Sequence, residues 1–357
     1  MACRAAIAAL AASLAGAAGC AAGERIVYSP DELRATIARR APAVPPDERI
    51  VPYEISEAHA AQARELVTGA TTDADKVRML VAAMFDPDVF GLHYADGAVG
   101  TAEETLASRR GDCLALASVF VGLARAVGVP AQFLDASVRI HETLYLDDET
   151  SVHFGHVTAM VDTGVGKVGL DFAQLGTIVW WRVIDDPEAL AHFYNNRGYA
   201  LLQGARSEGA AVDWVGAARQ FELAVAVKPG FARGWNNLGI AAAHLGRPDE
   251  ASADYRRAIE SDPALAAPRA NLGALLLQEG RLDQALAALE AAARLDPEGA
   301  HIQYTLAVAR LRKGDRDGAV RALRRALELN QGYPSARELL DQLTLGPAGS
   351  AAAGHGS

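Results

Sequence analysis

The chain has 357 residues, of which half are apolar and 22% are charged, a composition typical of globular proteins and long enough for two domains. Its formal net charge is −10 and it has no long basic cluster, which argues against nucleic-acid binding, because phosphate recognition needs a concentrated positive surface. Glycine-rich phosphate loops of the P-loop or dinucleotide type are absent, and we expect no cofactor and no metal.

The first nineteen residues have the features of a signal peptide, with an apolar run of about fifteen residues that is too short to span a bilayer. The small residues Ala17-Ala18-Gly19 directly before Cys20 resemble the bacterial lipobox, in which the cysteine is lipidated and becomes the new N-terminus. The alternative is an ordinary signal peptide cleaved near Ala22. Either interpretation predicts the cell envelope, and lipidation at Cys20 predicts a periplasm-facing lipoprotein held in the outer membrane.

The cysteine count supports a special role for one thiol. Cys3 would leave with the signal peptide and Cys20 would carry lipid, which leaves Cys113 as the single free thiol. In an oxidising compartment it has no intramolecular disulfide partner, as expected of a cysteine kept for its chemistry.

Between the lipid and this cysteine the sequence predicts a tether followed by helices. The tether covers residues 21–45 and contains one short helix near Ser29-Pro30-Asp31-Glu32. Amphipathic helices are expected over 56–67 and 73–85, with Ser56 and Asp73 as caps, and the sequence Thr101-Ala102-Glu103-Glu104 is a capping box that opens the next helix.

The cysteine itself opens an apolar helix. Asp112 is a good N-cap for it, and Gly128 ends it. Its apolar positions run almost all the way round, which predicts a central helix. A cysteine in the first turn lies at the positive end of the helix dipole, so the sequence predicts that the thiol of Cys113 has a lowered pKa.

After Pro130 the sequence predicts short strands, and two of them form a hairpin. The stretch 156–161 alternates, with Val157, Ala159 and Val161 on its core face, and a glycine-containing turn then leads into 168–171. If the hairpin is symmetric about this turn, His156 and Asp171 face each other directly across adjacent strands.

Three blocks of sequence, GDCLALASVFVGLARAVGVPA, GHVTAMV and GLDFA, resemble the transglutaminase-like (papain-type) cysteine protease/acyltransferase superfamily over about residues 50–185. Members of that superfamily present a cysteine, then a histidine, then an aspartate in this chain order, and the intervals here are 43 and 15 residues. The resemblance implies that Cys113 is the nucleophile, His156 the general base and acid, and Asp171 the carboxylate that orients the imidazole.

Several alternatives stay open for this site. His153 could replace His156 as the base, and Cys113, His153 and His156 could bind zinc, although the paired short-spacing ligands of structural zinc sites are missing. The backbone N–H of Cys113 and the side chain of Tyr94 are candidate oxyanion donors. The domain could also be a relic that has lost catalysis.

From about Asn195 onward the sequence repeats every 34 residues. Prolines, glycines and alanines recur at this spacing: Pro229, Pro263 and Pro297; Gly246, Gly280 and Gly314; Ala251, Ala285 and Ala319. The pattern Trp235…Leu238-Gly239…Ala251…Tyr255…Ala258…Pro263 resembles a tetratricopeptide repeat. We expect four repeats, the first with about seven extra residues between its helices, around 205–214. Arrays of this kind imply a groove for a protein or peptide partner.

The expected fold is therefore an α+β transglutaminase-like, papain-like domain, with the nucleophile helix packed on an antiparallel sheet, followed by an all-α tetratricopeptide superhelix. The expected boundaries are 1–19 for the signal peptide, 20–48 for the lipidated linker, 49–190 for the transglutaminase-like domain, 191–345 for the repeats with a capping helix, and 346–357 for a disordered tail. The expected function is that of an envelope-anchored cysteine hydrolase or acyltransferase acting on an amide or acyl carbonyl. The alternative is a non-catalytic envelope scaffold whose repeats bind partners.

Overall fold

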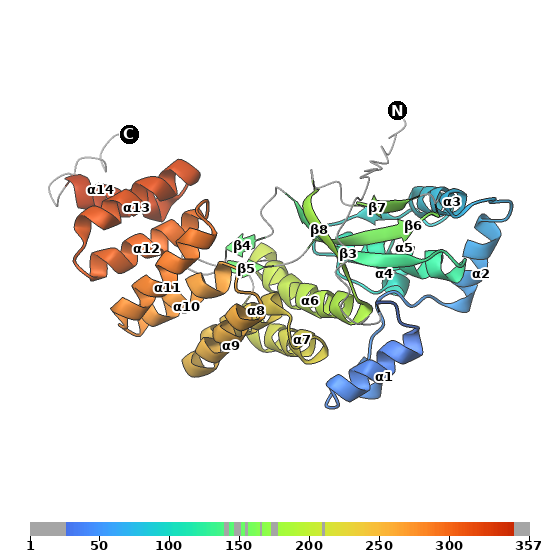
Figure 1. The fold of residues 1–357 in the computed structure, drawn as a ribbon, viewed down its shortest axis with the longest axis horizontal. Coiled ribbons are helices and arrows are strands. Elements are labelled where there is room, and N and C mark those ends of the chain that lie inside the picture. Colours follow the sequence, from blue (N-terminus) through green and yellow to red (C-terminus); the bar gives the residue numbers. More distant parts are fainter. Residues whose placement is uncertain are drawn as a thin grey trace. The chain divides into compact units, whose positions relative to one another are not determined.

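The computed structural model describes residues 26–138, 143–145, 151–153, 156–164, 166–172, 178–208 and 211–345 (Figure 1). Contacts divide the chain into two compact units: unit 1 comprises residues 1–142 and 154–229, and unit 2 comprises residues 143–153 and 230–357. Cys20 and the tail 346–357 lie outside the described residues. Among the helices of the described ranges, none has both the length and the apolar character needed to cross a membrane.

Unit 1 contains a four-stranded antiparallel sheet made of β3 (Ala131–Val138), β6 (His156–Asp162), β7 (Lys167–Leu170) and β8 (Ile178–Ile184), in the order β7-β6-β3-β8. The alternation predicted for β6 holds only in part, because every residue from His156 to Val161 is buried. The strand is therefore covered on both faces, and the histidine expected on the open face is enclosed within the unit.

Helices and two very short strands precede the sheet in unit 1. Their bounds are α1 (Pro30–Arg40), η1 (Pro46–Glu48), α2 (Glu57–Leu66), α3 (Asp73–Phe85), β1 (His93–Tyr94), α4 (Ala102–Ser108) and β2 (Arg110–Gly111). Ser56 caps α2, and the predicted capping box of Thr101 and Glu104 opens α4. Asp73 is not the cap of α3, because Thr72 takes that place in a capping box with Asp75.

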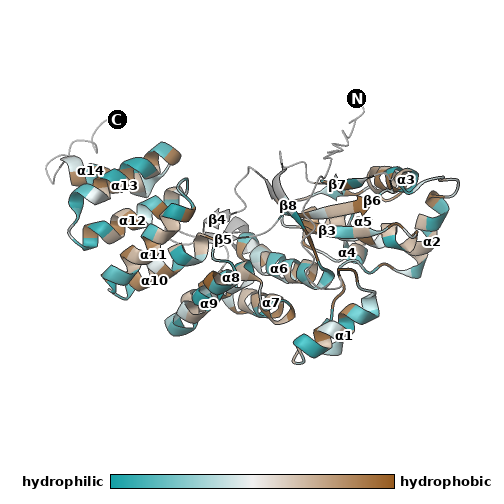
Figure 2. Cartoon of the chain, in the orientation of Figure 1, coloured by the Kyte–Doolittle hydropathy of each residue, from teal (hydrophilic) through white to brown (hydrophobic). Residues whose placement is uncertain are grey.

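The central helix of unit 1 is α5 (Cys113–Ala126), which packs against β6, β3, α2, α3 and α4. Asp112 caps its N-terminus, and Gly128, with φ of +78°, follows its C-terminus as predicted. Every residue from Cys113 to Ala124 is buried, and Figure 2 shows α5 as one of the more apolar segments of the chain. A helix buried on all sides holds its first turn, and the cysteine on it, in one place.

Gly122 lets α5 approach the backbone of a neighbouring segment, and its replacement tests this packing. A Cβ at residue 122 would lie 2.5 Å from the Tyr53 carbonyl oxygen and 2.8 Å from Ile55. We expect Gly122→Ala to lower the free energy of unfolding of unit 1 by about 1–3 kcal/mol, because the backbone must shift. Gly204→Ala is the matched control, since a Cβ there meets nothing within 4 Å and should stabilise its helix by about 0.5–1 kcal/mol. Urea unfolding of the two variants, followed by alkylation of Cys113 as it becomes exposed, measures both effects.

Two long helices, α6 (Asp186–Glu208) and α7 (Trp214–Val227), form the antiparallel pair that the sequence assigns to the first repeat. The first four residues of the stretch 205–214, where the extra residues are expected, belong to α6, which continues to Glu208. Contacts with α1 and β3 place the pair in unit 1, so the division by contacts falls after Pro229, whereas the sequence-based boundary falls at 190/191.

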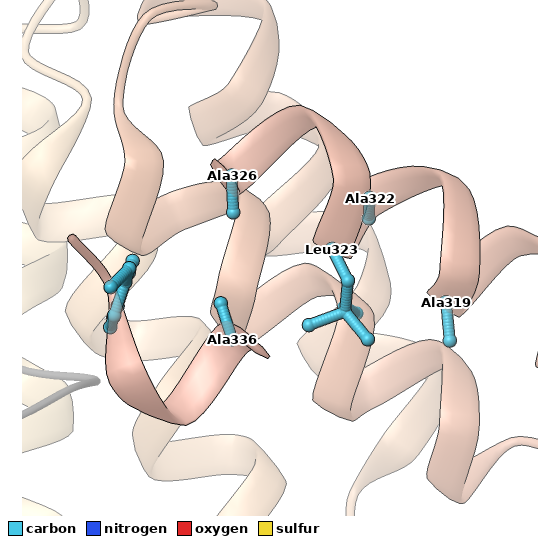
Figure 3. Packing of buried hydrophobic residues seen from close by; sticks show 7 residues of the cluster. Ala319, Ala322, Leu323, Ala326 and Ala336 are labelled. Atoms are coloured by element: carbon cyan, nitrogen blue, oxygen red, sulfur yellow. The ribbon is translucent and has the colours of Figure 1, made fainter. Parts of the chain in front are cut away.

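Unit 2 contains three further helix pairs and a final helix: α8 (Ala232–His244), α9 (Pro248–Ser261), α10 (Ala267–Gln278), α11 (Leu282–Leu295), α12 (Ala300–Arg312), α13 (Arg316–Leu329) and α14 (Pro334–Leu345). The recurring glycines Gly246, Gly280 and Gly314 all have positive φ, which explains their spacing, because each turn between paired helices needs a left-handed residue. Small residues let the helices approach closely, as the buried alanines of α13 and α14 show (Figure 3).

Two features cross the helix pairs of unit 2. The buried side chain of Asn271 on α10 donates a hydrogen bond of 2.9 Å to Asn236 on α8. The short hairpin of β4 (Thr143–Tyr145) and β5 (Ser151–His153) is grouped with this unit, and β5 lies against α8 and α10. The hairpin comes from the chain between β3 and β6, which belong to unit 1.

Candidate active site

The sequence-predicted nucleophile lies where the sequence places it, on the first turn of α5. Its position is fixed from both sides, because β2 immediately before it pairs in parallel with β1, and Asp112 caps the helix. The Asp112 carboxylate accepts a hydrogen bond of 2.8 Å from the amide of Ala115. Cys113 is a free thiol and only 7% exposed. The thiol is thus largely enclosed by protein.

His156 and Asp171 form an ion pair, with 3.1 Å between Nε2 of the imidazole and Oδ1 of the carboxylate. The direct opposition predicted for them is wrong, since Ala159 pairs with Leu170 and Asp162 with Lys167, which puts Thr158 opposite residue 171. The turn is thus centred one residue later than expected. Because the register differs by two residues, both side chains stay on the same face of the sheet and meet diagonally.

The other nitrogen of the His156 imidazole, Nδ1, is not used by Asp171. Nδ1 of His156 is buried and has no partner within hydrogen-bonding distance among the described residues, while the ring interacts electrostatically with Cys113. Burial disfavours the imidazolium, but Asp171 and Cys113 outweigh it and raise the pKa of His156 to about 10. With Nε2 held by Asp171, Nδ1 is the atom left to exchange a proton with Cys113 or with a substrate.

The pKa of the Cys113 thiol is raised, which corrects the prediction that the helix dipole lowers it. Burial is the main cause and the neighbouring Asp112 carboxylate adds to it, while His156 opposes both. A dipole at a helix N-terminus is a weak effect compared with removal of a thiolate from water. In the resting protein the pair of Cys113 and His156 therefore retains its protons at neutral pH.

Tyr94 on β1 lies beside this pair. β1 and β2 pair Tyr94 with Gly111, two residues before the nucleophile. Burial first, and then the negative charge of Cys113, hold the pKa of the Tyr94 hydroxyl well above its usual range. The hydroxyl therefore keeps its proton at physiological pH.

Further residues that the sequence did not single out surround Asp112. Burial raises the pKa of this carboxyl to about 6, against hydrogen bonds from Ala115, Asn196 and Leu114. Its amide donates to the Ala98 carbonyl at 3.0 Å. A pocket of about 460 Å³ borders the same segment, lined among others by Ala98, Arg110 and Arg197. None of the three triad residues lines this pocket.

A separate group of buried side chains, Asp135, Glu188 and His192, lies close enough together to suggest a metal site. However, Arg182 contacts both carboxylates, at 3.1 Å from Asp135, and Lys228 is 3.2 Å from Glu188. Burial alone would raise the pKa of Glu188, but Arg182 holds it below its usual range. Both carboxylates of the cluster are therefore already engaged in ion pairs with positive side chains, and a cation would have to displace these pairs.

The alternatives to this triad involve His153. Its backbone belongs to β5 in unit 2, while its side chain lies outside the described residues. The zinc site of Cys113, His153 and His156 therefore stays a prediction. Among the described residues, the grouping that brings a thiol, an imidazole and a carboxylate together is Cys113, His156 and Asp171.

A thiol on a helix N-terminus, with an imidazole and a carboxylate on adjacent strands, is the arrangement of cysteine-nucleophile acyl-transfer domains. The family comparison agrees. Residues 60–169 match the transglutaminase-like superfamily, and residues 232–265 and 276–343 match tetratricopeptide repeats. The chain thus contains a transglutaminase-like domain followed by tetratricopeptide repeats, as the sequence predicted.

Three similar solved structures each match less than half of the chain. MamA from Desulfovibrio magneticus RS-1 is 21% identical, covering 43% of this chain and 84% of that one, with a TM-score of 0.36. YrrB, described as a TPR protein with an unusual peptide-binding site, is 24% identical over 42% and 73%, with a TM-score of 0.35. PilF of Pseudomonas aeruginosa is 23% identical over 44% and 68%, with a TM-score of 0.39. No curated protein matches the chain.

Proposed function

We propose that this protein is a cysteine-dependent hydrolase or acyltransferase that acts on an amide or acyl carbonyl. The observation that carries the proposal is the ion pair of His156 and Asp171 beside the Cys113 thiol, inside a transglutaminase-like domain. A relic domain would have no need to keep three such groups together in a buried site, where each costs desolvation free energy.

In the proposed reaction the pair of Cys113 and His156 first loses one proton to solvent, and the resulting Cys113 thiolate attacks the carbonyl carbon beside the His156 imidazolium. The imidazolium proton then passes to the leaving amine as the carbon–nitrogen bond breaks, which leaves a thioester on Cys113. Water or a second amine attacks the thioester, the neutral His156 removes a proton from that nucleophile, and the carbon–sulfur bond breaks to release the acyl product and restore the thiolate–imidazolium pair. Asp171 holds the imidazole in place throughout.

The negative oxygen of the tetrahedral intermediate needs donors. The backbone N–H of Cys113 lies in the first helical turn, where amides have no partner within the helix. The protonated hydroxyl of Tyr94 is the second donor we propose, because Tyr94 pairs with Gly111, two residues before the nucleophile, and its hydroxyl stays neutral.

The tetratricopeptide repeats support a second activity, the binding of a protein or peptide partner. Arrays of this kind present an extended surface made of repeated helices, and the partner would bring the amide substrate or the amine acceptor to the thiol. The substrate and the choice between water and amine are not fixed by this surface.

Capture of the thioester tests the enzymatic proposal. The full chain is incubated with a glutamine-rich protein and a fluorescent primary amine, quenched in acid, and digested for mass spectrometry. We expect an acyl adduct on the Cys113 peptide, together with either a new amide or a hydrolysed side chain. Cys113→Ser and Asp171→Asn should abolish or strongly reduce both products. The same incubation is repeated with cell-envelope extract as the source of substrate. If no adduct forms on Cys113 there either, the result would favour the alternative of a non-catalytic scaffold.

We also propose that the protein is an envelope lipoprotein, attached through Cys20. A single acyl chain anchors weakly, whereas multiple acylation holds a protein in the membrane through washes. Wild-type protein is therefore expected in the membrane fraction, and Cys20→Ala in the soluble fraction. Equal fractionation of the two would contradict lipidation, and mass spectrometry of the mature N-terminus separates lipid attachment from cleavage near Ala22.

A further inference from the structure

The hairpin of β4 and β5 lies on a defined surface of unit 2. β5 lies against α8 and α10, which are the first helices of two successive pairs. α10 also lies beside both α8 and α12, so the first helices of the three pairs form one row. We call α8, α10 and α12 the first-helix row. The hairpin therefore contacts a surface that is built from successive repeats.

The neighbours of α10 show which of its faces points away from the second helices. A Cβ at Gly273 would lie 2.6 Å from a leucine of α11, so this side faces α11. Asn271 donates a hydrogen bond to α8, and Ala270 belongs to the same core cluster as Ile302 of α12. At 100° per residue, Ala274 lies between Asn271 and Ala270 around the helix and away from Gly273. Ala274 thus marks the open face of the first-helix row.

This open face is enclosed on two helices of the row. The equivalents of Ala274, one period of 34 residues before and after it, are Ile240 on α8 and Val308 on α12. Ile240 and Ala274 are 1% and 4% exposed, whereas Val308 is half-buried. The two enclosed positions lie on the two helices against which β5 lies. The enclosure of the open face therefore coincides with the place of the hairpin.

The row and the hairpin segment also have complementary charges. The sequences of α8, α10 and α12 contain no aspartate or glutamate but include Arg233, Arg269, Arg310 and Arg312. Arg269 and Arg312 donate to the backbone carbonyls of Pro263 at 2.8 Å and Leu277 at 2.9 Å, which does not neutralise their charge. The sequence 142–153, ETLYLDDETSVH, has four acidic residues and no lysine or arginine. A positive row in a chain of net charge −10 favours an acidic ligand.

We propose that the hairpin of β4 and β5 is an internal occupant of the partner-binding surface of the repeats. The open face of α8 and α10 then accepts an acidic peptide in an extended conformation, and such a partner has to displace the hairpin. A tethered segment competes at an effective concentration on the order of a millimolar, so weak ligands are excluded. This inference rests on the proposed binding of a protein or peptide partner and specifies the chemistry of that partner.

Thiol labelling in the full chain tests whether the hairpin covers this face. Residues 143–153 are replaced by a Gly-Ser linker of the same length, and Ala274→Cys is introduced into the wild-type chain and the linker chain. We expect N-ethylmaleimide to label the new thiol at least about ten-fold faster in the linker chain, because the opening that exposes it is no longer needed. Val308→Cys, at the same position one repeat later, is the matched control and should change less than about two-fold. Mass spectrometry of each peptide separates these thiols from Cys113.

Two labelling results would overturn the proposal. The thiol of Ala274→Cys could stay slow in the linker chain, in which case the hairpin is not what encloses it. Alternatively, Val308→Cys could accelerate as much as Ala274→Cys, which would make the hairpin a part of the folded core of unit 2 and not a removable occupant. If Ala274→Cys does not fold, Ile240→Cys provides the same comparison on α8.

Peptide binding tests the occupant itself. A fluorescent synthetic peptide of residues 142–153 is titrated into the wild-type and linker chains and followed by anisotropy. We expect it to bind the linker chain at least about ten-fold more tightly, because the tethered copy no longer competes. A peptide with its four acidic residues replaced by their amides should bind about ten-fold more weakly, and added salt should reduce this difference. Equal affinity for the two chains, or no binding to the linker chain, would overturn the internal occupant.

These outcomes are distinguishable from failure of the proposed function. Thioester formation at Cys113 is not measured in either experiment, so the enzymatic proposal is unaffected by them. If the linker chain ignores the hairpin peptide while the repeats retain another protein, the internal occupant is lost and the proposed partner binding stands. If the hairpin peptide binds as expected while no other protein does, the internal contact stands and the proposed partner binding is lost.

Discussion

Alkylation of Cys113 by iodoacetamide should be slow at pH 7 and rise about ten-fold per pH unit towards pH 9, because only the thiolate reacts. Burial raises the pKa of this thiol, and the pKa of His156 is raised to about 10, so both groups hold their protons at neutral pH. The reactive pair of thiolate and imidazolium forms as the first proton leaves, in the alkaline range. Turnover should follow the same rise and fall again above about pH 10, when the imidazolium is lost.

Substitutions of neighbouring residues test which groups set the pH dependence of Cys113 alkylation. His156 lowers the pKa of Cys113 against burial, so His156→Gln should slow alkylation at pH 8–9 by about ten-fold. Asp112→Asn removes a neighbouring negative charge and should speed it. His153→Ala should have little effect, and the urea-unfolded chain should show the ordinary thiol profile, with a midpoint of about pH 8.5. Mass spectrometry of the Cys113 peptide keeps Cys20 out of the measurement. A rate that stays high down to pH 5–6 would contradict the raised pKa.

Asp186→Ala should lower the free energy of unfolding of unit 1 by about 3–5 kcal/mol, the largest stability effect we expect in this chain. Asp186 is 1% exposed and pairs with both terminal nitrogens of Arg125, at 2.8 and 2.9 Å. It also accepts a hydrogen bond of 2.8 Å from the Tyr28 amide, and Arg125 stacks on the Tyr53 ring at 4.6 Å. Truncation leaves the guanidinium of Arg125 enclosed without its partner.

The comparison uses an exposed ion pair from the same unit. Asp31 and Arg34 lie 3.3 Å apart on α1, and Asp31→Ala should change the free energy of unfolding of unit 1 by less than about 1 kcal/mol. Because the chain has two units, the unfolding of unit 1 is followed separately, through exposure of Cys113 to alkylation in increasing urea. Equal effects of the two substitutions would show that burial of the Asp186 pair is unimportant.

The local features of the candidate site could be predicted because they depend on neighbouring residues. Asp112 as a cap, Cys113 on the first turn and Gly128 beyond the end all follow from preferences within one helix. The hairpin of His156 and Asp171 was predicted with its register shifted by two residues, yet strand geometry repeats every two residues, so the prediction that the side chains meet survived.

Features that depend on distant contacts could not be predicted. The raised pKa of Cys113 is caused mainly by burial. The apolar pattern of the helix predicts this burial. It does not show that burial, completed by the sheet, has a larger effect on the thiol than the helix dipole. A repeat pattern also does not specify what the first helix pair of the array packs against. The placement of α6 and α7 with unit 1 has the same origin.

The hairpin of β4 and β5 has a consequence for the order in which this chain folds. Its neighbours α8 and α10 are made long after it during synthesis, so the hairpin emerges well before the helices it packs against. Contacts between segments so far apart in sequence carry a large loop-closure entropy and form slowly. Residues 143–153 of unit 2 lie within the sequence of unit 1, so a single cut of the chain cannot separate the two units.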